Sequence, residues 1–194
     1  MKEIFTAILL SFSLLIVSGC IGNITVDLSS HRPAQSNSKL AAISPQIINF
    51  EKIQDVRIPG VAEGTREAAF GVPMGNVEFI PTASEIVNNV IKSELQNAGH
   101  KLSSNSQYVL GGKIKVFNVR TKTTLLYWDI VGKLNVELNV ANPKINDSII
   151  LDSSCSDRTY LYPSGKLIKK VMNKCLDDFA NQFRENEQII STLK

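Results

Sequence analysis

Few side chains in this sequence have distinctive reactivity: it holds three cysteines and two histidines among 194 residues. His31 and His100 have no cysteine or carboxylate nearby at metal-ligand spacing, so we expect no metal site and predict that both are solvated loop residues. A Ser-His-Asp or Cys-His catalytic site would require the fold to bring one of them to a nucleophile. No local pattern prepares such a site, and the sequence predicts no catalytic residue and no cofactor.

Cys155 and Cys175 form an even pair that could close a disulfide in an oxidising compartment. In its strand-like stretch, Cys155 alternates in phase with Leu151, which places it on the apolar face. Cys175 follows Val171 at helical spacing in the C-terminal segment. Both sulfurs are expected to point into the core, as a disulfide or as two buried free thiols.

Asp55 and Arg57 flank Val56 directly after the first predicted core strand. A carboxylate and a guanidinium can form a bidentate pair, which would either brace the following loop or bind a ligand. Bracing is the favoured interpretation because such pairs commonly order loops.

The connection 120–128 mixes cations with aromatic side chains, including the only tryptophan. Tryptophan, tyrosine and arginine anchor protein interfaces more often than other residues do. A candidate partner-binding surface therefore consists of Arg120, Lys122, Tyr127 and Trp128. In the favoured alternative, Leu126 and Trp128 continue the core face, because Trp128 shares strand parity with the apolar residues that follow.

The N-terminus combines an apolar run with a cysteine behind small residues. Residues 4–17 are interrupted only by single Thr and Ser residues, which is typical of a signal peptide and shorter than the roughly 20 residues of a spanning helix. The next stretch, Val17-Ser18-Gly19-Cys20, resembles the lipobox of bacterial lipoproteins. The resemblance implies cleavage before Cys20, which would become an N-palmitoyl, S-diacylglycerol cysteine. Ile21, where aspartate would retain the protein at the inner membrane, implies the outer membrane, with the domain facing the periplasm.

These boundaries divide the chain into a signal peptide (1–19), a lipidated tether with a short strand (20–38) and a single domain (39–194). The tether assignment follows from the polar, proline-broken run 29–38. A formal net charge of +3 without a Lys/Arg run gives no support to nucleic-acid binding. The expected partners are the membrane, through the covalent lipid, and another envelope protein.

Hydrophobic patterns predict the elements of the domain. Thr82 and Glu85 form a capping box before an amphipathic helix that ends at Gly99, and a long second helix follows Pro163-Ser164. Four runs are predicted to be strands: 40–50, 108–119, 130–141 and 149–160. The region 51–79 is expected to be a long loop or short irregular strands. The predicted fold is α+β, a two-layer sandwich in which two helices cover one face of a mainly antiparallel sheet, in the order β-α-β-β-β-α.

Several of these features together resemble the YajG-like lipoproteins of the bacterial envelope. The matching positions are the lipobox, the strand at 24–28, Asp55-Val56-Arg57, the helix 83–98 with Gly99, and the strand 108–114. The resemblance implies an envelope lipoprotein and does not imply a reaction.

We therefore expect a membrane-anchored envelope lipoprotein with a non-enzymatic binding or scaffolding role. One alternative is an accessory subunit of an envelope transport or assembly machine. Another is a cell-wall hydrolase that uses carboxylates, which would need two acidic residues about 5 to 9.5 Å apart in a cleft.

Overall fold

Three long antiparallel strands make up most of the sheet in the computed structural model, which describes residues 22–33, 37–68, 71–124 and 126–194. They are β7 (Tyr108–Thr123), β8 (Trp128–Ala141) and β9 (Asn146–Thr159). The predicted alternation of β8 is confirmed: its even-numbered side chains from Ile130 to Val140 face the core, where Gly132 leaves space for a helix. β7 ends later than predicted, and β8 and β9 begin earlier than predicted.

Shorter strands complete a mixed sheet that has nine strands among the described residues: β1 (Ile24–Asp27), β2 (Ile47–Phe50), β3 (Gln54–Asp55), β4 (Gly64–Glu67), β5 (Pro73–Ile80) and β6 (Lys101–Leu102). One edge of β7 pairs in succession with β2, β3 and β4, all parallel to it. β5 runs antiparallel to β4, and β1 pairs with β5 at the far edge. The region 51–79 thus holds three short strands, and the run 40–50 holds a 3-10 turn, η1 (Leu40–Ala42), before β2.

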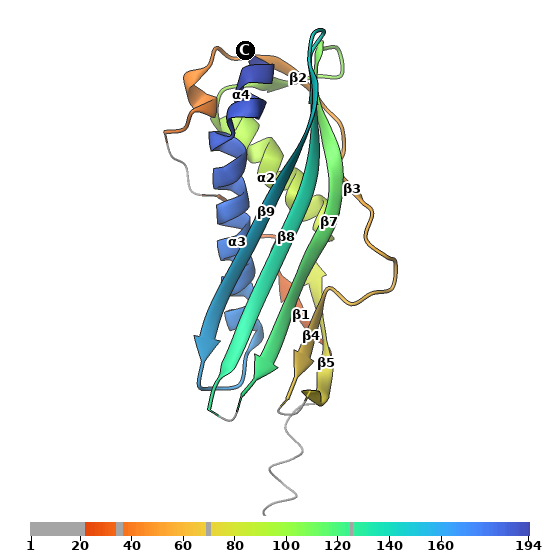
Figure 1. Cartoon of the computed structure of the whole chain (residues 1–194), viewed down its shortest axis with the longest axis vertical. Coiled ribbons are helices and arrows are strands. Elements are labelled where there is room, and N and C mark those ends of the chain that lie inside the picture. Colours follow the sequence, from red (N-terminus) through yellow and green to blue (C-terminus); the bar gives the residue numbers. More distant parts are fainter. Residues whose placement is uncertain (1–21, 34–36, 69–70, 125) are drawn as a thin grey trace, which may run out of the picture.

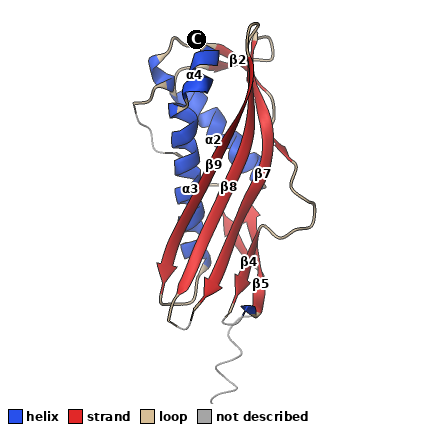
Figure 2. Ribbon diagram, viewed as in Figure 1, coloured by secondary structure: helices blue, strands red, loops and turns tan. Residues whose placement is uncertain are grey.

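Helices cover one face of this sheet, as Figures 1 and 2 show. They are α2 (Ala83–Asn97), α3 (Gly165–Glu185) and α4 (Glu187–Leu193). The capping box is confirmed, since the Glu85 backbone N–H donates to Thr82 Oγ1 while Glu85 Oε2 accepts from the Thr82 backbone N–H. The predicted number of helices was wrong. Asn186 ends α3 and caps a third helix, because its side chain accepts two backbone N–H groups of the next turn.

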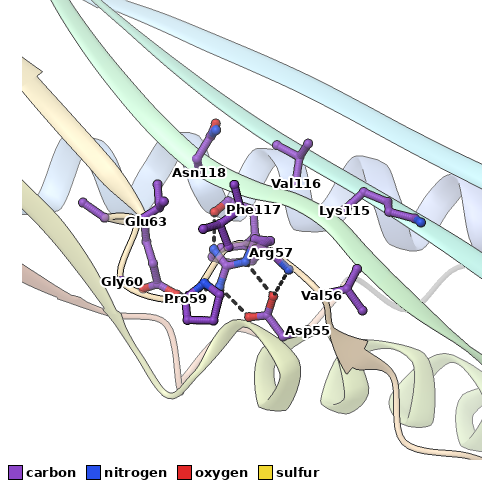
Figure 3. Close-up of a pocket in the computed structure, with 13 residues that line it drawn as sticks. Asp55, Val56, Arg57, Pro59, Gly60, Glu63, Lys115, Val116, Phe117 and Asn118 are labelled. Carbon is purple, nitrogen blue, oxygen red and sulfur yellow. Dashed lines mark hydrogen bonds and ion pairs between the residues drawn. The ribbon is translucent and has the colours of Figure 1, made fainter.

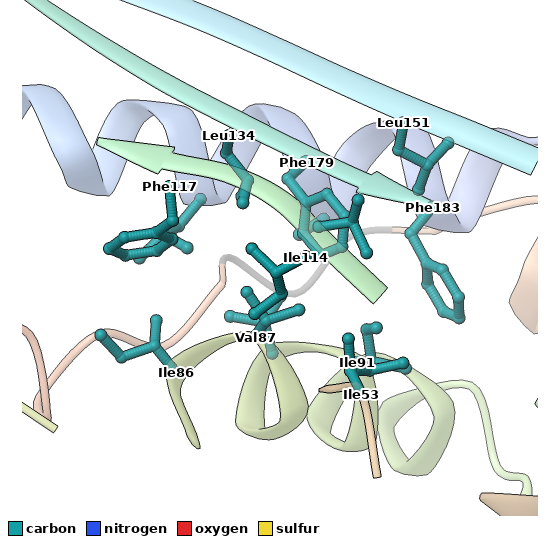
Figure 4. Close-up of a cluster of buried hydrophobic side chains, with 14 of the residues drawn as sticks. Ile53, Ile86, Val87, Ile91, Ile114, Phe117, Leu134, Leu151, Phe179 and Phe183 are labelled. Carbon is teal, nitrogen blue, oxygen red and sulfur yellow. The ribbon is translucent and has the colours of Figure 1, made fainter. Parts of the chain in front are cut away.

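The core fills the space between the two layers (Figure 4). Phe117 on β7 and Phe179 and Phe183 on α3 are at most 1% exposed, and α2 adds the apolar side chains Val87 and Ile91. The predicted α+β, two-layer class is therefore confirmed, with a sheet more mixed than expected.

The segment expected to be a tether packs against the domain over its described residues 22–33. β1 lies in the sheet, and Leu28 and Pro33 are buried. The prediction of solvated histidines was wrong. The His31 side chain is 6% exposed, with Nε2 3.5 Å from Asp177 Oδ1 on α3, and His100 is 3% exposed and accepts a backbone N–H at Nδ1.

Candidate functional site

A cleft of about 610 Å³ opens where the pairing along β7 is interrupted. β3 pairs with β7 up to Ile114 and β4 begins to pair at Val119, so the edge of β7 between them has no strand beside it. The connection 56–63 arches over this gap, and β7 carries a bulge against β8 at the same level. The cleft therefore lies between a loop and the unpaired edge of a strand (Figure 3).

Arg57 occupies the centre of this cleft and binds both sides of it. Its Nε and Nη2 donate to the two carboxylate oxygens of Asp55 at 2.8 and 2.6 Å, and Nη2 also donates to Glu63 Oε1 at 3.0 Å. Its Nη1 donates to the backbone carbonyl of Phe117 at 2.6 Å. The guanidinium thus fills the place that a neighbouring strand's backbone N–H would take, and it joins the loop to β7.

Glu63 completes the network and was not anticipated from the sequence. Its Oε2 accepts the backbone N–H of Phe79 at 2.7 Å, and its own backbone carbonyl accepts from Val119. A lone acidic residue in an irregular region carries no local pattern, so no sequence signal could have identified this role.

The electrostatics of the cleft favour charged, paired groups over proton transfer. Hydrogen bonds from Arg57 hold the pKa of the Asp55 carboxyl below its ordinary value, and the hydrogen bond to Asp55 raises the pKa of Arg57. A general acid needs the opposite shift, a pKa raised toward neutrality. The arrangement is therefore suited to ordering a loop and presenting it.

The ordered loop presents apolar side chains to solvent. Val56, Ile58 and Val61 are 45%, 75% and 65% exposed. Three large apolar residues on one braced loop form a patch that could contact a partner. We call this segment, residues 56–63, the cleft loop.

The candidate partner-binding residues of the 120–128 connection lie on the β7–β8 hairpin, at the opposite end from η1 and α4 (Figure 1). Arg120 is bound to both carboxylate oxygens of Glu67 at 2.9 Å, and Lys122 is exposed. The Arg158 guanidinium lies 3.7 Å from the Tyr127 ring centroid. The hairpin thus brings the four residues to one end of the sheet, and Arg120, Tyr127 and Trp128 each contact a neighbouring side chain there.

The alternative prediction, that Leu126 and Trp128 continue the core face, is wrong for Leu126, which is 78% exposed. Trp128 is half-buried, and its ring meets that of Tyr162 edge-on with centroids 5.4 Å apart. Trp128 lies at the end of the core face and not within the core, because α3, which covers that face, begins only after Tyr162.

Cys155 and Cys175 are brought together as free thiols. Cys155 on β9 pairs with Gly132 on β8, and a Cβ placed on Gly132 would lie 3.2 Å from Cys175 Sγ. The pKa of the Cys175 thiol is raised mainly by burial and to a smaller extent by a hydrogen bond with Cys155. The two thiols are neighbours in the structure, and burial keeps the Cys175 thiol protonated.

Cys20 lies outside the described residues. Within the described ranges, no group of three or more His, Cys, Asp or Glu side chains could hold a metal ion. No helix in the same part of the chain combines the length and the apolar character needed to cross a bilayer.

Comparisons with known proteins identify the fold only. No family model and no curated protein matches the sequence. Protein XCC0632 from Xanthomonas campestris, of family DUF330, has a TM-score of 0.59 at 9% identity, covering 87% of this chain and 96% of that chain. The PelC dodecamer from Paraburkholderia phytofirmans (TM-score 0.33, 10% identity, 69% and 86% covered) and lipoprotein GNA1162 from Neisseria meningitidis (0.31, 11%, 68% and 97%) are more distant. This chain therefore shares the fold of XCC0632, and the other two likenesses carry no argument.

Proposed function

We propose that the protein is a lipoprotein of the bacterial outer membrane, anchored through lipid on Cys20, whose periplasmic domain binds another envelope protein. The carrying observation is the stretch Val17-Ser18-Gly19-Cys20, directly behind an apolar run of signal-peptide length and directly before the first described residues of the domain. The resemblance to YajG-like lipoproteins supports the same proposal.

Substitution of the cysteine tests the anchor. Two or three acyl chains hold a protein on a bilayer essentially permanently. Cys20→Ala should therefore shift the protein from the membrane pellet to the soluble fraction and abolish incorporation of labelled palmitate, and sucrose-gradient fractionation should place the wild type in the outer membrane. Cys155→Ala is the matched control and should remain on the membrane. Continued membrane attachment of Cys20→Ala would refute the proposal.

The cleft loop supports a binding role because its brace holds apolar side chains in water. Ordering a loop costs conformational entropy, and here the network around Arg57 offsets that cost before any partner arrives. An accessory subunit of an envelope transport or assembly machine would be one such binding protein.

A carboxylate hydrolase is the competing proposal, and the cleft does place Asp55 and Glu63 around one cation. Glycoside hydrolysis needs one carboxylic acid with a raised pKa beside one carboxylate. The lowered pKa of Asp55 opposes that assignment to it.

Crosslinking in intact cells distinguishes a binding surface from bare exposure. We expect Ile58→Asp to reduce recovery of the crosslinked partner, because the substitution puts a charge into the apolar patch. Ile150→Asp, at a side chain 66% exposed on β9, is the matched control and should leave recovery unchanged. Equal loss in both variants, or in neither, would remove the cleft loop as the binding surface.

A further inference from the structure

The described chain begins at one end of the sheet, where Arg66 holds it. The Gly22 backbone N–H donates to the Met74 carbonyl at 3.2 Å. Arg66, only 2% exposed, donates from Nη2 to the carbonyls of Gly22 and Met74, and from Nη1 to the Tyr162 hydroxyl. Gly22 is thereby fixed beside the turn that joins β9 to α3.

The proposed lipid site is very close to this point. Cys20 precedes Gly22 by two residues. Two residues of chain reach at most about 7 Å, so acyl chains on Cys20 would begin within that distance of Gly22. The end of the sheet that contains Gly22 must then face the bilayer surface.

The same end carries a cluster of exposed apolar and aromatic side chains. Their exposed fractions range from 39% to 79%, and the members are Val72, Leu126, Tyr160, Leu161 and Tyr162, which we call the tip cluster. Strand register brings them together, because Glu67 pairs with both Pro73 and Lys122, and Trp128 pairs with both Thr123 and Thr159. Figure 1 shows the ends of β4, β7 and β9 and the start of β5 at this end of the molecule.

The charges around the tip cluster are compatible with a lipid surface. Glu67 is paired with Arg120, and Asp129 is paired with Arg158, so both acidic side chains are neutralised. Lys122 is exposed beside them. Tyrosine rings with an apolar body and a polar hydroxyl are the side chains that proteins place at the level of lipid headgroups.

We propose that the tip cluster inserts into the headgroup layer of the leaflet that holds the Cys20 lipid, so that the domain has a fixed orientation on the membrane. The inference rests on the proposed lipidation of Cys20. The bilayer is favoured over a protein partner because the short connection to Cys20 holds these side chains against lipid at high effective concentration. Lys122, Tyr127 and Trp128, considered above as a partner surface, then lie at the level of the headgroups.

Trp128 provides an internal probe, since it is the only tryptophan and it touches Tyr162 of the tip cluster. The experiment reconstitutes the lipidated protein into phosphatidylethanolamine–phosphatidylglycerol vesicles whose acyl chains are brominated near the headgroup. Insertion of the tip to the headgroup–acyl boundary should reduce Trp128 emission about twofold relative to vesicles without bromine.

A charged double variant and a matched control separate insertion from anchoring. Leu126→Asp with Leu161→Asp should remove the quenching while the protein still sediments with the vesicles. Ile47→Asp with Ile150→Asp changes two exposed apolar residues on β2 and β9, outside the tip cluster, and should leave the quenching intact. Unchanged melting by circular dichroism confirms that both double variants fold.

The possible failures are distinguishable. If the wild type sediments with vesicles but Trp128 is not quenched, the insertion is overturned and the anchor stands. If the wild type does not sediment, the proposed lipidation fails first. If Cys20→Ala protein dimerises in sedimentation velocity and the tip variant abolishes the dimer, the tip cluster is an interface between copies and the membrane proposal is wrong.

Discussion

Replacing Arg57 by methionine should destabilise the domain, because one guanidinium holds together three segments of chain. Methionine keeps much of the side-chain volume and removes the four donated hydrogen bonds to Asp55, Glu63 and the Phe117 carbonyl. The substitution leaves two carboxylates facing each other without a cation. The cleft loop then loses its connection to β7.

The expected loss in unfolding free energy follows from the exposure of the partners. The side chains of Arg57, Asp55 and Glu63 are 20%, 30% and 19% exposed, so water can replace only part of what is lost. A hydrogen bond to a charged group contributes roughly 1.5 to 3 kcal/mol, and shared donors and partial exposure reduce the sum. We expect a loss of about 2 to 3 kcal/mol for Arg57→Met. Arg57→Lys should lose about half as much, since it keeps the charge without the bidentate fork.

The assay is urea unfolding of the Cys20→Ala domain, followed by circular dichroism at neutral and acidic pH. Because the pKa of Asp55 is lowered in the folded protein, its contribution is complete above its ordinary value of 3.8 and is lost as pH falls through the folded pKa. The difference between wild type and Arg57→Met should therefore shrink as pH falls through that window. A loss below about 0.5 kcal/mol at neutral pH would refute the brace and would favour a ligand-binding role for Arg57.

Three further outcomes are expected. We expect Cys155 and Cys175 to oxidise during export and to resist alkylation until they are reduced. Reduction should lower the unfolding free energy by about 3 kcal/mol for a loop of about 20 residues, and reactive thiols in protein purified from the membrane fraction would contradict this. Burial lowers the pKa of His100, so its contribution to stability should be full above its ordinary value of 6.5 and should fall as pH decreases toward the folded pKa. His100→Asn should therefore flatten part of that decline in urea midpoints, the rest being due to His31, whose pKa burial also lowers; an undiminished decline would contradict this. Gly75→Ala should lower the melting temperature and make the N-terminal segment more sensitive to proteolysis, because Gly75 has φ +114° and a Cβ there would collide with the Gly22 carbonyl. Gly22→Ala is the control and should be harmless, since a Cβ on Gly22 meets nothing within 4 Å.

The parts of the fold that sequence predicts best are those with long, regular periods. The β8 alternation and the α2 capping box each depend on neighbours within a few residues, so local pattern is sufficient. Strands of two to four residues show no period, and β3 and β4 are strands only because β7 offers them an edge more than fifty residues away. The break between α3 and α4 turns on one capping residue, Asn186, inside a continuous helical pattern.

The candidate sites divide in the same way. Asp55 and Arg57 were visible because they are two residues apart, whereas Glu63 and the Phe117 carbonyl reach the same guanidinium through the loop and the sheet. Arg66 gave no signal at all, since a lone arginine among glycines and charges looks like a solvated residue. Its burial depends on the approach of Gly22 and Tyr162, which tertiary structure alone determines.

The short connection between Cys20 and β1 also bears on where a partner can bind. A long flexible tether would let any face of the domain meet a partner, and surface position would carry little information. Here residues 22–33 are packed into the domain, so a lipid on Cys20 would fix the tip cluster at the bilayer and set every other surface at a defined height. The cleft loop lies along the side of β7, away from the strand ends that would contact lipid (Figure 1). With the proposed anchor, a partner of the cleft loop would approach parallel to the membrane, which would make a neighbouring anchored or membrane-spanning protein a better candidate than a freely diffusing one.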